Sequence, residues 1–225
     1  MLKKQTDDFY DLPTKRKAPL YFFLVRILDI FVAVVGIIIL FPLYVITAMA
    51  IMIEDPHNPF YTPKRVGKNK KLFTFIKFRS MLHNAWELER KDKELMKKLR
   101  GGKHKVENHP YVTKVGKFIR KYSIDETPQL INVLVGQMSF VGPRALFPDE
   151  IEKFYKDYPN HKKYMDALFQ VKPGITGFWQ VSGRNKIDFD KRIRMEAYYA
   201  RNYNIFDDLL IILKTPFAVL KAETH

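Results

Sequence analysis

Residues 20–53, LYFFLVRILDIFVAVVGIIILFPLYVITAMAIMI, are apolar apart from Arg26 and Asp29, and residues 30–53 carry no charge at all. A helix rises about 1.5 Å per residue, so the uncharged part alone would reach roughly 36 Å, against a bilayer hydrocarbon core of about 30 Å. A cleaved signal peptide fits poorly, because the run is far longer than a signal h-region and continues past the cleavage-like triplet at residues 48–50. The stretch therefore predicts a membrane helix.

Pro42 interrupts this helix, because proline removes a backbone donor and clashes with the preceding turn, so we expect a kink or break near Phe41-Pro42. Basic residues flank the stretch about equally: Lys3, Lys4, Lys15, Arg16 and Lys17 before it, and Lys64, Arg65, Lys68, Lys70 and Lys71 after it. Under the positive-inside rule, a straight span should have more basic residues on one flank than on the other. The equal flanks therefore favour a re-entrant helix that enters and leaves by one face, with Arg26 and Asp29 near the headgroups. A kinked single span is the alternative, because long following domains can translocate regardless of charge.

The composition predicts one catalytic domain beside this helix. Apolar residues make up 47% of the 225 residues, enough for one real core. The 39 Lys and Arg against 24 Asp and Glu leave a net charge of +15, which predicts an anionic partner such as nucleic acid, an anionic membrane face or a phosphorylated substrate. The absence of cysteine excludes disulfides and thiolate chemistry. We expect a basic N-terminal segment at 1–19, the re-entrant helix at 20–55, and an interfacial catalytic domain at 56–225.

The catalytic domain should be mostly α with a small β element, an α+β fold. Alternation from Lys71 to Arg79 predicts a short strand with Lys77 and Arg79 on one face. Gly136 suits the left-handed position after a helix. Helices are predicted over residues 86–99, 112–122 (amphipathic and basic), 128–135, 149–157, 161–169, 188–203 and 206–222, the last renewed at Thr215-Pro216.

Two adjacent carboxylates, Asp125 and Glu126, stand at a helix start in the segment Ser123-Ile124-Asp125-Glu126-Thr127-Pro128. Capping alone would explain them, with either Ser123 capping and Glu126 as its box partner, or Thr127 capping before Pro128. The setting favours chemistry, because the free amides of a helix end and the nearby Arg120 and Lys121 attract phosphate. An ionised aspartate there can attack phosphorus when cations, such as a divalent metal, offset the charge of the substrate.

Basic clusters and two glycine loops supply further candidates for phosphate binding. Seven cations and no acid lie between Lys64 and Arg79, and the adjoining membrane stretch makes lipid phosphate a simpler partner than nucleic acid. The loops at residues 138–144 and 172–184 end in Arg144 and Arg184; their glycines permit close backbone approach, although tight turns under a helix would explain them equally well. The six histidines show no metal-ligand spacing, and no Walker loop, Rossmann fingerprint or nucleophile elbow occurs.

Together these segments resemble the bacterial sugar transferase family, the monotopic phosphoglycosyl transferases. The resemblance covers about residues 20–222 and rests on several motifs in the family's order. They are the Pro42-broken membrane helix, Lys77-Phe78-Arg79-Ser80-Met81, the run from Val112 through Ser139-Phe140-Val141-Gly142-Pro143-Arg144, the loop from Pro173 to Arg184, Tyr198-Tyr199 and Lys214-Thr215.

The resemblance implies a reaction and its residues. Asp125 would attack the sugar-linked phosphate of a UDP-sugar, expel UMP and hold the phosphosugar until undecaprenyl (polyprenyl) phosphate attacks in turn. Glu126 would be the partner carboxylate, holding Mg²⁺ together with Asp125 or managing a proton. Residues implied near the phosphates are Lys77, Arg79, Arg120, Arg144 and, as a weaker match, Arg184; Glu196 and Gln180 are additional candidates.

The resemblance also implies a place in the cell. The chain looks like the short form of the family, with a re-entrant helix in the bacterial inner (cytoplasmic) membrane and its catalytic domain on the cytoplasmic face. It would start capsule, O-antigen, exopolysaccharide or glycoprotein glycan assembly. Expected partners are a UDP-sugar, undecaprenyl phosphate, anionic membrane lipids and downstream glycosyl transferases, with no nucleic acid.

Some residues depart from the family pattern. His109-Pro110-Tyr111 stands for the common Asp-Pro-Arg, Thr127 for leucine, Ala145 for a second proline, and Glu196 for an aspartate. The longer Glu196 side chain would shift any metal or substrate contact. Two alternatives stay open: a membrane-anchored lipid-binding adaptor without catalysis, and a related enzyme such as a polyprenyl phosphate phosphatase or a UDP-releasing glycosyl transferase.

Overall fold

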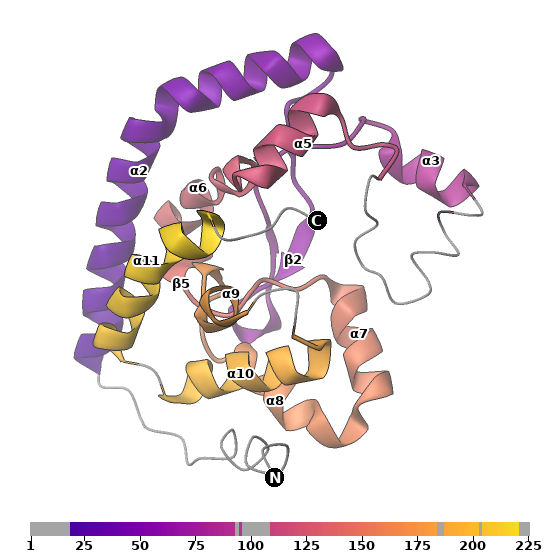
Figure 1. Cartoon of the computed structure of the whole chain (residues 1–225). Helices are drawn as coiled ribbons and strands as arrows, with labels where there is room; N and C mark the ends of the chain where they lie inside the picture. The colour runs from indigo at the N-terminus through magenta and orange to yellow at the C-terminus, as the bar shows by residue number, and fades with distance from the viewer. Residues whose placement is uncertain (1–18, 93–94, 96–108, 184–186, 203, 221–225) are drawn as a thin grey trace.

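The computed structural model describes residues 19–92, 95, 109–183, 187–202 and 204–220 (Figure 1). One long helix, α2 (Pro19–Glu54), runs along the outside of the molecule, and the remaining elements lie within its curve (Figure 1). This mostly helical architecture with small sheets confirms the predicted fold class.

Helix α2 bends partway along its length (Figure 1), and Pro42 lies inside it. The bend agrees with the predicted kink, whereas the predicted break is absent, because the 36 residues form one continuous helix. Most apolar side chains of α2 face outward; Ile38 and Ile39 are each 68% exposed. Within the described part of the chain, α2 is the one helix long and apolar enough to cross a membrane.

The polar residues of α2 fasten it to the rest of the molecule. Arg26 donates to the carbonyls of Val133 and Leu134, at 2.7 and 2.9 Å, at the C-terminal end of α6 (Gln129–Leu134). Asp29 is buried and accepts hydrogen bonds from the hydroxyl of Ser139, at 2.9 Å, and from the amide that follows it in β5 (Ser139–Val141). Both groups, which we expected at the headgroups, are therefore engaged with the domain.

Three two-stranded sheets form the β part. Strand β1 (Phe60–Tyr61) pairs antiparallel with β4 (Lys77–Phe78), β2 (Lys64–Val66) pairs antiparallel with β3 (Leu72–Thr74), and β5 pairs parallel with β6 (Gly174–Thr176). The predicted strand 71–79 is therefore divided into β3 and β4. The Phe75 amide still donates to the Pro63 carbonyl, in register with the β2–β3 pair, whereas the Ile76 amide donates to the Asn132 side chain, which takes Ile76 out of the ladder.

The predicted helices are present with shifted ends. They are α3 (Ala85–Lys91), α5 (Lys114–Lys121), α6, α7 (Pro148–Asp157), α8 (Lys162–Leu168), α10 (Phe189–Asn202) and α11 (Ile205–Leu220); α9 (Phe178–Ser182) and the short turns η2 (Lys68–Lys70), η3 (Ile124–Glu126) and η4 (Pro159–His161) are additional. Gly136 has φ +83°, so its predicted left-handed position is confirmed. The predicted renewal at Thr215-Pro216 is wrong, because α11 continues through Pro216. Most of residues 92–99 lies outside the described part.

Four buried hydrophobic clusters occur among the described residues, and two of them hold most of these elements together. The larger joins α7, α8 and α10 around the fully buried Phe154, Met165 and Ile193. The smaller includes Val133 and Met138 and lies between α2 and the sheets. The two glycine loops pack on each other: a Cβ on Gly174 would lie 2.1 Å from the Gly142 amide nitrogen. These glycines therefore allow contact between two backbones, and the loops position β5, β6 and Arg144.

Candidate active site

The Asp125–Glu126 pair lies in η3, between α5 and α6. Ser123 precedes η3 in the left-handed conformation, with φ 55°, and its side chain makes no cap bond. The Thr127 hydroxyl donates to the Ile124 carbonyl at 2.8 Å, and α6 begins after Pro128 without a side-chain cap. Both predicted capping arrangements are therefore wrong, and helix capping does not account for the two carboxylates.

Asp125 is the buried member of the pair, with 6% of its surface exposed. Its carboxylate accepts no hydrogen bond from the residues that the structure describes, and it pairs with Lys77 Nζ at 4.0 Å. Burial and the neighbouring charge of Glu126 raise the pKa of Asp125 to about 6. A buried carboxylate without hydrogen-bond donors retains its oxygen lone pairs for a metal or an electrophile.

Three cations from separate elements surround this carboxylate. Lys77 comes from β4, Arg120 from α5, and Arg144 from the loop after β5. Each of these positive charges opposes the rise in the pKa of Asp125. Burial in turn lowers the pKa of Lys77. The site thus places concentrated positive charge around one buried acid, an arrangement suited to a phosphorylated ligand.

Neighbouring side chains orient the two arginines. The Ser80 hydroxyl accepts a hydrogen bond from Arg120 Nε at 2.8 Å. Arg144 Nη1 lies 3.4 Å from Glu126 Oε1, and this negative charge raises the pKa of Arg144. Glu126 therefore connects the acid pair to Arg144 directly.

Glu196 supports the site from behind. It is 1% exposed, and its Oε1 accepts a hydrogen bond from the Arg144 backbone amide at 3.1 Å. Arg192, one turn earlier in α10, lies with its Nε 3.6 Å from the same oxygen. Burial raises the pKa of Glu196. Glu196 thus acts on the position of Arg144, and Arg192, which the sequence did not single out, holds Glu196.

Two other residues predicted for the site, Arg79 and Gln180, make hydrogen bonds to groups other than the acid pair. All five N–H groups of Arg79 are engaged, with the Asp55 carboxylate and with the carbonyls of Asp55, His57, Asn58 and Met81. Arg79 therefore has no donor left for a phosphate, and we correct its assignment to a structural one. Gln180 donates to the Ile175 carbonyl at 3.2 Å within its own loop. Arg184 lies outside the described residues.

Comparison with known proteins identifies the family of the chain. The family described as "Bacterial sugar transferase" matches residues 20–222. The chain belongs to the bacterial sugar transferase family. It is 38% identical over 204 residues to the undecaprenyl-phosphate galactose phosphotransferase of Salmonella typhimurium, covering 89% of this chain and 41% of that protein.

Other relatives in the bacterial sugar transferase family differ in length. The galactosyl transferase CpsE of Streptococcus agalactiae is 40% identical over 196 residues, which are 87% of this chain and 42% of CpsE. The exopolysaccharide production protein ExoY of Rhizobium meliloti is 36% identical over 200 residues, which are 86% of this chain and 84% of ExoY. The chain thus spans about two fifths of the length of several of its relatives.

The Asp125–Glu126 pair fits a hard divalent cation. Mg²⁺ prefers carboxylate oxygens and usually binds one or two of them together with substrate phosphates. Asp125 offers a carboxylate that no described donor occupies, and Glu126 stands beside it in sequence and raises its pKa. These two residues would hold the ion.

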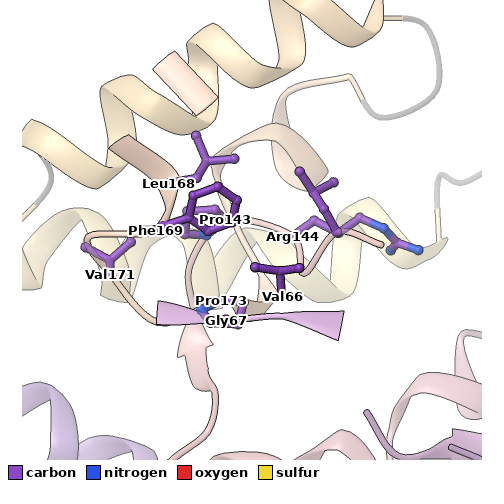
Figure 2. Close-up of a pocket in the computed structure, with 9 residues that line it drawn as sticks. Val66, Gly67, Pro143, Arg144, Leu168, Phe169, Val171 and Pro173 are labelled. Atoms are coloured by element: carbon purple, nitrogen blue, oxygen red, sulfur yellow. The ribbon is translucent and has the colours of Figure 1, made fainter. Parts of the chain in front are cut away.

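A pocket beside Arg144 is distinct from this acid pair. Apolar side chains such as Val66, Leu168 and Phe169 line most of it, and the Arg144 guanidinium points away from them (Figure 2). Its lining offers no acid and no second cation, so a nucleotide diphosphate would find little to bind there. The pocket lies beside the Arg144 loop and is lined mostly by apolar side chains.

A second polar cluster lies where α2 ends. Asp55 Oδ1 is 2.5 Å from His57 Nδ1 and 3.4 Å from His83 Nδ1. The histidines show no metal-ligand spacing in the sequence, because His57 and His83 belong to segments that meet only in the fold, through the β1–β4 pairing and the Arg79–Asp55 contact.

Proposed function

We propose that this chain transfers a sugar 1-phosphate from a UDP-sugar to undecaprenyl phosphate and releases UMP, as the first membrane step of a bacterial glycan pathway. The observation that carries the proposal is the buried Asp125, with Lys77, Arg120 and Arg144 around it. The site also adjoins the apolar helix, since Tyr44 of α2 donates to the Thr127 carbonyl at 2.9 Å. The names of relatives that act on undecaprenyl phosphate point to the same acceptor.

The reaction proceeds by two displacements at one phosphorus atom. An ionised oxygen of Asp125 attacks the phosphorus linked to the sugar, and the bond from that phosphorus to UMP breaks. An oxygen of undecaprenyl phosphate then attacks the same phosphorus, and the bond to Asp125 breaks. The lipid carries the sugar diphosphate, Asp125 is ionised again, and no net proton is consumed.

The surrounding residues neutralise and position the phosphates. Lys77, Arg120 and Arg144 place positive charge around the buried acid, where it offsets the charge of the diphosphate as the first displacement occurs. Glu126 holds Arg144, and Glu196 fixes its backbone. Mg²⁺ held by Asp125 and Glu126 would supply further neutralisation of phosphate charge.

The membrane places the acceptor beside this site. We place α2 in the bacterial inner membrane as a re-entrant helix, with the catalytic domain on the cytoplasmic face beside anionic lipid headgroups. The lipid phosphate lies at the membrane interface, so a shallow helix holds Asp125 near it. The lipid-linked sugar then passes to downstream glycosyl transferases.

The test follows UMP release. Protein held in nanodiscs is incubated with Mg²⁺, undecaprenyl phosphate and a panel of UDP-sugars, and a quenched sample without the lipid is assayed for sugar phosphate bound to protein. We expect UMP from one donor, covalent label without lipid, and loss of both in Asp125→Asn. Asp166→Asn, a substitution of an aspartate in α8, is the matched control and should keep both.

Other outcomes identify the alternatives. UDP or inorganic phosphate as product would indicate a UDP-releasing glycosyl transferase or a phosphatase. Absence of product from every donor, with vesicle binding intact, would favour the lipid-binding adaptor. Equal UMP release by Asp125→Asn would remove Asp125 as the nucleophile.

A further inference from the structure

The end of α2 brings three metal-binding side chains to one point. Asp55 directly follows the helix, His57 is two residues further on, and His83 follows β4 and the Arg79 segment. One carboxylate oxygen and two imidazole nitrogens lie within 4.8 Å of one another. Both Nδ1 atoms face the same oxygen, Asp55 Oδ1.

The two oxygens of Asp55 have separate tasks. Oδ2 accepts bonds from Arg79 and from the His83 backbone amide, the latter at 2.9 Å. Oδ1 faces the two imidazoles. Arg79 thus fixes Asp55 from behind through its carboxylate and its backbone carbonyl, as a second-sphere partner does in metal sites.

The imidazoles are placed to move into coordination. Their side chains are each 45% exposed, and their rings stack with centroids 3.4 Å apart. Ligands at about 2.0–2.2 Å from a tetrahedral ion lie about 3.3 Å from each other. The distance from Asp55 Oδ1 to His83 Nδ1, at 3.4 Å, already matches, and His57 needs only a side-chain rotation to open its 2.5 Å contact.

We propose that Asp55, His57 and His83 bind a transition-metal ion of the zinc class. Two imidazole nitrogens and one carboxylate oxygen suit Zn²⁺ and its first-row neighbours, whereas Mg²⁺ prefers an all-oxygen shell. Three protein ligands leave a fourth tetrahedral position for water. The ion joins the chain leaving α2 to the segment after β4, and it is separate from the acid pair proposed for Mg²⁺.

Zn²⁺ binding tests the site without reference to activity. Untagged protein in detergent, first treated with a chelator, competes for Zn²⁺ against a chromophoric chelator, and thermal unfolding is recorded with and without the ion. We expect one Zn²⁺ whose affinity falls at least tenfold in His57→Gln and in His83→Gln, because each removes one of three ligands. A rise in Tm with Zn²⁺ should be lost in both variants.

These variants should still fold, because only backbone groups of the two histidines hold Arg79 and Asp55 in place. The His57 carbonyl accepts from Arg79 and the His83 amide donates to Asp55, and the substitutions leave both groups unchanged. Equal unfolding temperatures without Zn²⁺ would confirm this. His161→Gln is the matched control, since His161 also lies 2.5 Å from an aspartate, Asp190, and should keep the Zn²⁺ affinity of the wild type. Unchanged affinity in both His57→Gln and His83→Gln, or displacement of Zn²⁺ by an equal concentration of Mg²⁺, would overturn the proposal.

Discussion

At the scale of single residues, burying the Asp125 carboxylate costs folding free energy, and its proposed role as the nucleophile explains this cost. Its pKa rises from 3.8 to about 6 on folding, so the folded protein binds this proton more tightly than the unfolded chain does. An acid shifted in this direction lowers stability above its folded pKa and has no effect below its unfolded pKa. The buried Asp125 carboxylate is therefore a source of instability at neutral pH.

Replacing Asp125 should consequently stabilise the protein while it abolishes transfer. We expect Asp125→Asn to raise the free energy of unfolding at pH 7.5 by about 1–3 kcal/mol, with the gain shrinking as the pH falls from 6 toward 4. Thermal unfolding in one detergent across this pH range measures the effect. Wild-type transfer should itself decline as the pH falls through about 6, because protonation removes the nucleophile.

Asp166→Asn provides a control of opposite sign. Burial would raise the pKa of Asp166, but bonds from Lys70 and Tyr155 outweigh it and lower that pKa. Its replacement should therefore lower the unfolding temperature at pH 7.5. Equal destabilisation by both substitutions would contradict the electrostatic account of Asp125.

At the same scale, sequence motifs predicted most of the residues that gather at the candidate site. Motifs identified Asp125, Glu126, Lys77, Arg120 and Arg144, and the structure brings all five together. A motif fixes residue type but not the direction of a side chain. Arg79 is therefore turned to Asp55, and Glu196 supports a backbone amide, for reasons that only the packing reveals.

At the scale of elements, α5 reaches the site by close contact with the strand region. A Cβ on Gly116 would lie 1.9 Å from the Ser80 carbonyl oxygen, and the Ser80 hydroxyl holds Arg120. We expect Gly116→Ala to displace α5, to destabilise the protein by about 1–3 kcal/mol, and to reduce transfer at least tenfold. UMP release and thermal unfolding measure both effects.

Gly67→Ala is the comparison for that variant. Its added Cβ would meet the ring of the buried Phe73 at 3.1 Å, so the ring has to move by only a few tenths of an ångström, whereas the Cβ on Gly116 meets backbone at 1.9 Å. The loss in stability and transfer should therefore be much smaller. A wild-type rate in Gly116→Ala would show that the position of α5 does not govern the site.

Helix α2 depends on Pro42 for its proposed re-entrant path. Pro42→Ala restores a backbone donor and removes the ring, so the helix should straighten and carry the N-terminus to the opposite face. The chain has no cysteine, so Lys4→Cys and Lys71→Cys each give a single site for a membrane-impermeant thiol reagent. Labelling of both positions from one side in the Pro42→Ala background would contradict this prediction.

Short elements mark the limit of prediction at this scale. Helical periodicity predicted α7, α8, α10 and α11, because the apolar residues on the core-facing side of a helix recur every three or four positions in the sequence. Strands β5 and β6 have three residues each and pair across a wide separation in sequence, so they are too short for an alternation of apolar and polar residues to predict them.

At the scale of the whole molecule, α2 and α11 lie side by side (Figure 1). Both helices carry exposed apolar side chains. Phe206, Leu213 and Phe217 of α11 recur on one helical face and are 68–77% exposed. We expect an apolar face of this kind, beside the apolar helix α2, to lie in lipid.

A polarity-sensitive dye tests this placement. Attached to Leu213→Cys, it should report an apolar environment when the protein is reconstituted into vesicles, whereas the same dye on Lys153→Cys in α7 should report water. Aqueous emission from both positions would place α11 outside the bilayer.

The bonds that fasten α2 also impose an order in time. Tyr21 donates to Asp208, 187 residues later, at 2.7 Å. At about 5–20 residues per second, a ribosome needs about 10–40 s to make this partner after Tyr21 itself. Val133 and Ser139, which bind Arg26 and Asp29, follow those two residues after about 5–20 s at the same rate. Nascent α2 lacks these partners until then, and we expect the insertion machinery or lipid to cover its apolar side chains before its own domain exists.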